Sequence, residues 1–390
     1  MASEGPMQPG GGDPFAEIPL FRELQRVLMS GTGPVNWELA RQVGMAVAAS
    51  AGEDPAPTDD DRRQLEDTVR AAELNVAELT GLPQPPDVAQ VRAVRRSQWV
   101  SEGIGGLSEL VEPSAARMSE VFSKLQAEEA PAEQPPFAAA MLGQVVPLLL
   151  GAQAGTAFGV LAQRILGQHD IPVPRPGPGA VVFVVPNIAA FERDWSLPPV
   201  EFREWVSLHE VVHRFQFARP WVRDHVLALV RDFASNLDVD VNQLMERLQG
   251  IDPSNPQALE DLMRNGDDLL TPTLDDEQRL QQARVQSFLA AAEGYGEHVT
   301  EALGRRMLTS ADRIEEAVRR AGEGDAGEPV FERLIGVDMQ REQYELGARF
   351  CQTVVELTDE PTLARMWDSA ESLPSRPELE EPRLWLARIA

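Results

Sequence analysis

Apolar residues recur at three- and four-residue spacing along most of the chain, a pattern typical of amphipathic helices. Glycine, proline and acidic stretches separate the periodic segments and mark their ends. We therefore predict helices over residues 18–29, 36–50, 59–80, 91–104, 107–127, 224–237, 277–308 and 339–357.

A further helix is expected after Trp195. Ser196 is a suitable N-cap, and Pro198 or Pro199 fits the first helical turn, where a missing N–H costs nothing. Pro220 should end or kink this helix near Phe217, because proline cannot continue the hydrogen-bonded ladder.

One strong strand signal stands out, the run VVFVV at 181–185. No other strong strand and no repeat of 20–50 residues is visible. The sequence thus predicts a mainly α fold with at most a small β-sheet. The stretch after residue 357 is expected to wrap the surface irregularly because of its prolines: Pro361, Pro374, Pro377 and Pro382.

Composition shifts along the chain suggest three regions. Residues 1–17 have neither the basic start nor the apolar core of a signal peptide and are expected to form a flexible tail. A helical region over 18–135 then ends in a proline-rich connection at 128–136. Residues 136–390 form the third region, which contains the candidate metal-binding residues. It could pack with residues 18–135 as one domain. The acidic segment 250–277 and the loop 322–329 are expected at the surface.

Residues 137–162 contain no charge and are numerous enough to span a bilayer. Gln144, Gln153, Pro147 and several glycines oppose that interpretation, and neither end carries a basic cluster or an aromatic belt. Small residues at close spacing let helices approach tightly inside a protein core. A buried helix, or a broken pair of helices, is the better interpretation.

The chain has 390 residues, of which 62 are Asp or Glu and 35 are Lys or Arg, giving a formal net charge of −27. Repulsion of phosphate groups makes binding to nucleic acid or to an anionic membrane surface improbable. Cys351 is the single cysteine, which excludes an internal disulfide framework and suits a reducing cytoplasm.

The sequence HEVVH, from His209 to His213, lies in the helix expected after Pro199. Residues four apart on a helix lie one above the other, so both imidazoles can reach one metal ion. Glu210 points about 80° away from that direction, where its carboxylate can accept a proton from a water on the metal. The histidines lie on an inward-facing stripe made by Phe202, Val206, His209, His213 and Gln216. The alternative is a pair of hydrogen-bonded core histidines without a metal.

A hydrolytic zinc site requires a third protein ligand. The segment EGYGE offers Glu293 and Glu297, one turn apart on the predicted helix 277–308. Gly294 and Gly296 leave room for close backbone approach, although glycine costs about 1 kcal/mol in a helix interior relative to alanine. A solvated acidic helix face is the alternative for this segment.

HEVVH followed by a helical EGYGE resembles the gluzincin pattern, although the 79 residues between His213 and Glu293 exceed the usual separation. Residues 90–390 more specifically resemble an actinobacterial zincin-like family described as zinc-dependent metalloproteases or hydrolases. One branch of that family is associated with deazaflavin-coenzyme biosynthesis. The stretches that carry this resemblance are 150–170, 197–226, 293–299 and 343–351.

The resemblance implies a mainly helical, zincin-like metallohydrolase fold with Zn²⁺ as cofactor. It implies that His209, His213 and Glu293 bind the metal and that Glu210 is the catalytic base. Glu297, one turn later, would accept the free N–H of a ligating histidine and so fix its tautomer.

Four further side chains are weaker candidates. Tyr295 and Tyr344 could donate to the oxyanion of a tetrahedral intermediate, with core packing as the alternative. His298 could support the site or replace a ligand. The same two roles are open to His225. His169, beside Asp170 in a proline-rich loop, has no evident partner.

These features predict a cytoplasmic zinc metallopeptidase or amide hydrolase acting on a peptide or a small amide. The rival from another class is a non-catalytic scaffold that uses zinc for stability. A displaceable water at the fourth coordination position would favour the enzyme, whereas a fourth protein ligand would favour the scaffold.

Overall fold

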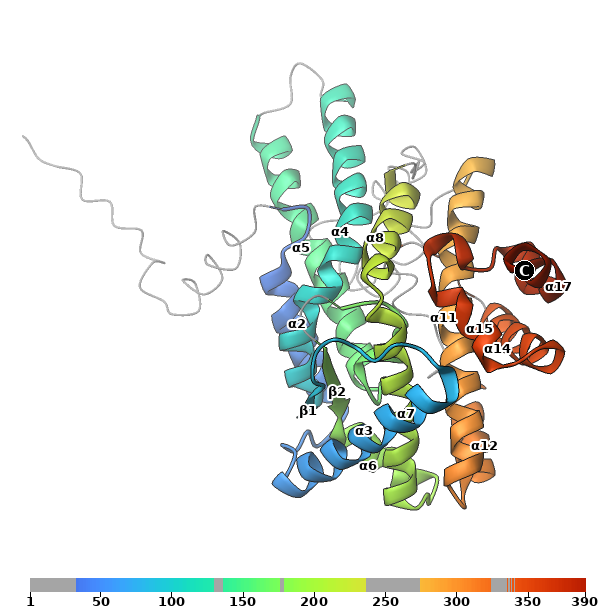
Figure 1. Cartoon of the computed structure of the whole chain (residues 1–390). Coiled ribbons are helices and arrows are strands. Elements are labelled where there is room, and N and C mark those ends of the chain that lie inside the picture. Colours follow the sequence, from blue (N-terminus) through green and yellow to red (C-terminus); the bar gives the residue numbers. More distant parts are fainter. Residues whose placement is uncertain are drawn as a thin grey trace, which may run out of the picture.

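A computed structural model describes residues 33–129, 136–175, 179–235, 274–323 and 341–390, together with Ile335, Val337 and Met339. Within this part of the chain, long helices surround one two-stranded sheet (Figure 1). The predicted mainly α fold with a small sheet is confirmed. The expected tail 1–17, the helix 18–29 and most of 250–277 and 322–329 lie outside the described residues.

The first two described helices begin at local caps. In α2 (Trp37–Ser50) the side chain of Asn36 accepts the backbone N–H of Leu39, and α3 (Asp59–Thr80) starts with a capping box of Thr58 and Asp61. Gly81 ends α3 with a φ of 65°, a conformation that glycine adopts without strain. The periodicity predicted both helices correctly because all of these signals are local.

The charge-free segment forms one helix, α5 (Pro136–Ala162), which contains Pro147 and packs against α2. A Cβ at Gly155 would overlap the carbonyl oxygen of Ala40, so the missing side chain permits this close approach. Among the described residues, no helix is long and apolar enough to cross a membrane. The preference for a helix packed within the fold is confirmed over this described part.

Residues 91–104 were expected to be helical, and this expectation is wrong at its start. Gln90–Val94 form strand β1, which pairs in parallel with β2 (Ala180–Val184) in the register Gln90↔Ala180. Helix α4 (Arg96–Glu129) begins only afterwards, where Asp54 accepts the backbone N–H groups of Arg96 and Ser97. Both the pairing and the cap depend on residues distant in sequence, which periodicity does not detect.

Helices α7 and α11 form the centre of the fold. Helix α7 (Pro199–Phe217) contacts α3 on one side and α11 (Asp276–Met307) on another, and α11 also packs against α14 (Arg341–Leu357). The other described elements between α5 and α14 are the 3₁₀ turn η1 (Gln168–Asp170), α6 (Val185–Asp194), α8 (Pro220–Ser235) and α12 (Ala311–Glu323).

Ser196 was expected to cap α7, but Pro198 occupies the N-cap position and Ser196 has a φ of 52°. Pro199 fills the first turn as predicted, and α7 ends at Phe217 before Pro220 opens α8. Ser196 therefore shapes the turn before the helix and does not cap it.

The C-terminal stretch is more regular than expected. Its prolines begin short helices, α15 (Glu360–Ala364), α16 (Arg376–Glu380) and α17 (Pro382–Ile389), because proline is tolerated in a first helical turn. Trp367 and Trp385 from this stretch are almost fully buried. Helices on both sides of the expected boundary at residue 135 share one apolar core, and the division itself stays a prediction.

Candidate metal centre

The HEVVH residues lie on α7 as predicted, and both histidines project from the same face. The imidazole rings of His209 and His213 are 4.6 Å apart between centroids and nearly perpendicular. His213 is fully buried, whereas His209 is partly exposed. The four-residue spacing on a helix accounts for this arrangement.

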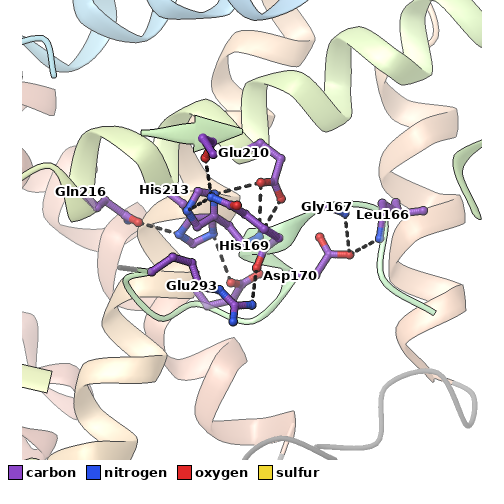
Figure 2. Close-up of polar contacts among 11 residues, drawn as sticks. Leu166, Gly167, His169, Asp170, Glu210, His213, Gln216 and Glu293 are labelled. Carbon is purple, nitrogen blue, oxygen red and sulfur yellow. Dashed lines mark hydrogen bonds and ion pairs between the residues drawn. The ribbon is translucent and has the colours of Figure 1, made fainter. Parts of the chain in front are cut away.

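Helix α11 supplies the carboxylate that completes the group. His209, His213 and Glu293 each offer a ligand atom, and these atoms lie within 4.8 Å of one another. His213 Nε2 and Glu293 Oε2 are 3.4 Å apart, and both are buried without a hydrogen-bond partner (Figure 2). Because buried polar atoms are normally paired, these two atoms indicate a cation between them. Two imidazoles and one carboxylate are a donor set that zinc accepts.

Gln216 fixes the orientation of His213. The Nδ1 atom of His213 lies 2.6 Å from Gln216 Oε1, while Gln216 Nε2 donates to the carbonyl oxygen of Ala292 at 2.9 Å. Since the amide nitrogen of Gln216 is used by Ala292, its oxygen accepts, and the His213 proton therefore lies on Nδ1. The lone pair of Nε2 then faces the metal position.

The protonation of the three ligands suits a metal site. Burial and the nearby His213 lower the pKa of His209 to about 4, so this imidazole is neutral at physiological pH. Burial opposes a charge on Glu293, but its contact with His213 outweighs burial and lowers the pKa of the carboxyl. Burial likewise opposes protonation of His213, and Glu293 outweighs it and raises the pKa of this histidine. Protons therefore compete with a metal mainly at His213.

Glu210 is fully buried and is held by His169. Its carboxylate accepts the backbone N–H of His169 at 3.0 Å and lies 2.9 Å from His169 Nδ1 (Figure 2). Burial raises the pKa of Glu210 to about 8, against the opposing effect of these hydrogen bonds. His169 also lies beside the His-His-Glu group, with its ring centroid 5.8 Å from that of His213.

The expectation that His169 has no partner is therefore wrong. Its partner Glu210 is 41 positions away in the sequence, so no local pattern connects the two residues. Two signals could have indicated the histidine: the chain has only five histidines, and the stretch 150–170 that carries the family resemblance ends with QHD.

Three glycines make room for the centre. A Cβ at Gly167 would overlap the carboxylate of Glu210, and one at Gly296 would lie 2.8 Å from His213 Nε2. Gly294 faces the backbone of Gly347 on α14, so it allows the two helices to approach closely. The sequence predicted a specific reason for both glycines of EGYGE. Gly296 leaves room for His213, and Gly294 lets α14 approach.

Gln216 is the hydrogen-bond partner of His213 Nδ1, so Glu297 does not support this histidine, and its expected support of a ligating histidine stays a prediction for His209. Tyr295 is buried against the ring of Trp367 and lies on the opposite side of α11 from Glu293, since residues two apart on a helix diverge by about 200°. It packs in the core and does not face the metal position.

His298 pairs with Glu360 at the start of α15, 2.9 Å away, and is not among the residues that converge on the metal position. Tyr344 on α14 is half-buried against the core. His225 contacts the rings of Trp221 and Phe288. The structure thus assembles His209, His213, Glu293 and Glu210 from the sequence-based candidates, and adds His169 and Gln216.

The fold and the converging His-His-Glu group define a zincin-like protein. The family model of the zincin-like metallopeptidases matches residues 35–386, and the chain belongs to this family. A crystal structure from Chloroflexus aurantiacus, described as "a putative hydrolase with a novel fold", is 28% identical in sequence. Its similarity covers 91% of this chain and 98% of that chain, with a TM-score of 0.64. No curated protein matches the chain. The family and this related structure both support a hydrolase.

Proposed function

We propose that the chain is a zinc-dependent amide hydrolase in which His209, His213 and Glu293 hold the metal and Glu210 acts as the general base. The observation that carries the proposal is that His213 Nε2 and Glu293 Oε2 are buried, lie 3.4 Å apart and have no hydrogen-bond partner, with a His209 nitrogen within 4.8 Å. Glu210 follows His209 directly and comes from the same buried turn of α7.

A zinc ion held by His209, His213 and Glu293 would supply Lewis acidity, which in zinc hydrolases lowers the pKa of a water molecule to about 7. Glu210 accepts the proton of the attacking water and then delivers it to the departing amine. Burial raises the pKa of Glu210 to about 8 in the metal-free protein, and a cation held by the neighbouring ligands would lower this pKa and favour the carboxylate that accepts a proton. The backbone N–H and imidazole of His169 hold this carboxylate in place during the transfer.

The substrate is an amide, either in a peptide or in a small metabolite. The resemblance to a family with a branch in deazaflavin-coenzyme biosynthesis is the reason to test small amides beside peptides. A cytoplasmic location stays the expectation from the single cysteine, Cys351.

The test compares wild type with Glu210→Gln in digests of a peptide library and of a set of small amides. Glu204→Gln is the matched control, since Glu204 lies on the same helix almost two turns earlier and outside the centre. We expect Glu210→Gln to keep zinc, measured by ICP mass spectrometry, and to lose at least about 100-fold in turnover. Glu204→Gln should retain turnover.

Full turnover by Glu210→Gln would contradict the assigned base. A wild type that binds zinc through a fourth protein ligand and hydrolyses nothing would instead establish the scaffold role. His213→Ala should lose most of the metal in either case.

A further inference from the structure

Arg175 carries a positive charge that forms no direct ion pair with a carboxylate among the described residues, although Glu210 is close enough to act on it electrostatically. Its Nη2 donates to the carbonyl oxygen of Gln168 at 3.0 Å, while Nε and Nη1 are buried without a hydrogen-bond partner. The guanidinium lies over the ring of Trp99, 6.0 Å from its centroid. Burial lowers the pKa of Arg175 to about 9, yet the group is still cationic at neutral pH. A buried, unpaired cation is costly, which indicates a missing anion.

The guanidinium faces a cavity of about 480 Å³. Two other arginines line the cavity, and both are already paired: Arg92 with Glu102 at 2.5 Å, and Arg214 with Asp87 at 3.2 Å. The carboxylates on the cavity wall are therefore each bound to their own arginine. Among the described cations of this wall, Arg175 is the one with no carboxylate in an ion pair.

The cavity shares a wall with the candidate metal centre. His169 and Phe217 line it, and their rings lie 5.8 Å and 5.5 Å from the ring of His213. The charge of Arg175 also acts on Glu210, whose pKa it lowers. A group bound at Arg175 thus lies in a cavity that adjoins the centre through His169 and Phe217.

We propose that Arg175, backed by Trp99, binds a carboxylate of the substrate. A guanidinium donates several N–H groups in one plane and suits a carboxylate, and the aromatic ring fixes that plane. The substrate class is then an amide whose leaving amine is an amino acid with a free carboxylate: the last peptide bond of a peptide, or an N-acyl amino acid. This inference rests on the proposed hydrolase function and names the substrate of the same site.

The test uses matched substrates that differ only at this group: peptides ending in a free carboxylate or in a primary amide, and N-acetyl amino acids beside their amides. We expect wild type to favour the acids by about 10–100-fold in kcat/KM, which is the size of a hydrogen bond to a charged group. The peptide and N-acetyl arms show which of the two sources is the better substrate.

Arg175→Gln should abolish this preference while leaving zinc content unchanged. Arg219→Gln is the control: Arg219 also donates to a backbone carbonyl, that of Pro83, and does not line the cavity. If Arg175→Gln does not fold by circular dichroism, Arg175→Lys retains the charge and should keep part of the preference. The comparison of acid and amide in wild type needs no variant.

Calorimetric binding of N-acetyl amino acids and their amides separates the two proposals. Hydrolysis with no preference for acids would overturn the carboxylate site and leave the hydrolase intact. Selective binding of acids that Arg175→Gln removes, without hydrolysis of any amide, would support the carboxylate site and overturn the hydrolase. Neither binding nor hydrolysis would overturn both.

Discussion

At the scale of single residues, the centre depends on side chains that orient other side chains. Gln216 turns the lone pair of His213 toward the metal position, and His169 holds Glu210. Such supporting groups typically change metal affinity or activity by about 10–100-fold when removed. Substitutions of these supporting residues should therefore change metal affinity or activity by amounts that can be measured, as substitutions of the proposed ligands should.

Gln216→Ala should weaken zinc binding by about 10–100-fold, because His213 loses the acceptor that fixes its proton on Nδ1. Glu297→Ala should have a smaller effect, since Glu297 does not support His213, and Glu293→Ala should purify nearly free of zinc. Competition titrations with a chromogenic chelator measure all three. A larger loss in Glu297→Ala than in Gln216→Ala would show that the support is assigned to the wrong residue.

Gly167→Ala should inactivate the enzyme without removing zinc. The backbone at Gly167 is extended, with φ −141°, so alanine adopts it readily and the added Cβ acts only by displacing the Glu210 carboxylate. We expect a loss of at least about 100-fold in turnover, close to that of Glu210→Gln. Gly105→Ala is the control, because nothing lies within 4 Å of a Cβ there. An active Gly167→Ala would mean that Glu210 tolerates displacement.

At the scale of secondary-structure elements, the centre exists because α7 and α11 are held at a fixed separation. Helix α14 braces α11 through a glycine contact in which Gly347 faces the carbonyl of Ala290 and Gly294 faces the backbone of Gly347. Interiors are closely packed and do not absorb an extra methyl group without a shift. A change in this contact therefore moves Glu293 relative to the histidines.

Gly347→Ala should destabilise the protein by about 1–3 kcal/mol, as overpacking does, and should also weaken zinc binding because α11 is displaced. Urea unfolding with and without zinc measures the two effects. Gly322→Ala, on α12, is the control because a Cβ there meets no atom within 4 Å. Loss of stability with unchanged zinc affinity would show that α11 keeps its place despite the substitution.

Elements with signals close in sequence were predictable, and those that depend on distant partners were not. Helix α3 has its capping box and terminal glycine within its own segment, and its bounds agree with the prediction. Strand β1 is a strand because it pairs with residues 180–184, and α4 starts where Asp54 caps it. The same distinction applies to the centre: HEVVH and EGYGE are local patterns, whereas the contact of His169 with Glu210 forms only in the fold.

At the scale of the whole molecule, burying the centre links its chemistry to stability. Glu210 is fully buried with a pKa of about 8 in the metal-free protein, well above that of an unfolded glutamate. The folded state therefore binds more protons than the unfolded state between these two values, so stability falls as the pH rises from the unfolded pKa toward 8 and levels off above it. His209, with a pKa of about 4, acts in the opposite direction only below about 6.5.

In EDTA-treated protein, the free energy of unfolding should therefore decrease between pH 6.5 and 8.5, and it should decrease less in Glu210→Gln, which cannot ionise. Urea titrations at several pH values measure both slopes. The charge of Glu210 also raises the pKa values of His213 and Asp170, so the difference between the two slopes reports Glu210 together with its effect on these two groups. Equal slopes would mean that Glu210 is already ionised in the folded state near pH 6.5.

The distance along the chain between the metal ligands determines when the centre can form during synthesis. After His213, the ribosome adds 79 residues before it reaches the codon of Glu293. At about 5–20 residues per second, that interval lasts roughly 4–16 s on the ribosome. During this time the nascent chain holds two imidazoles but not the carboxylate that completes the donor set. The complete set of three ligands therefore exists only after Glu293 in α11 has been translated, and a metal can engage all three only from that point on.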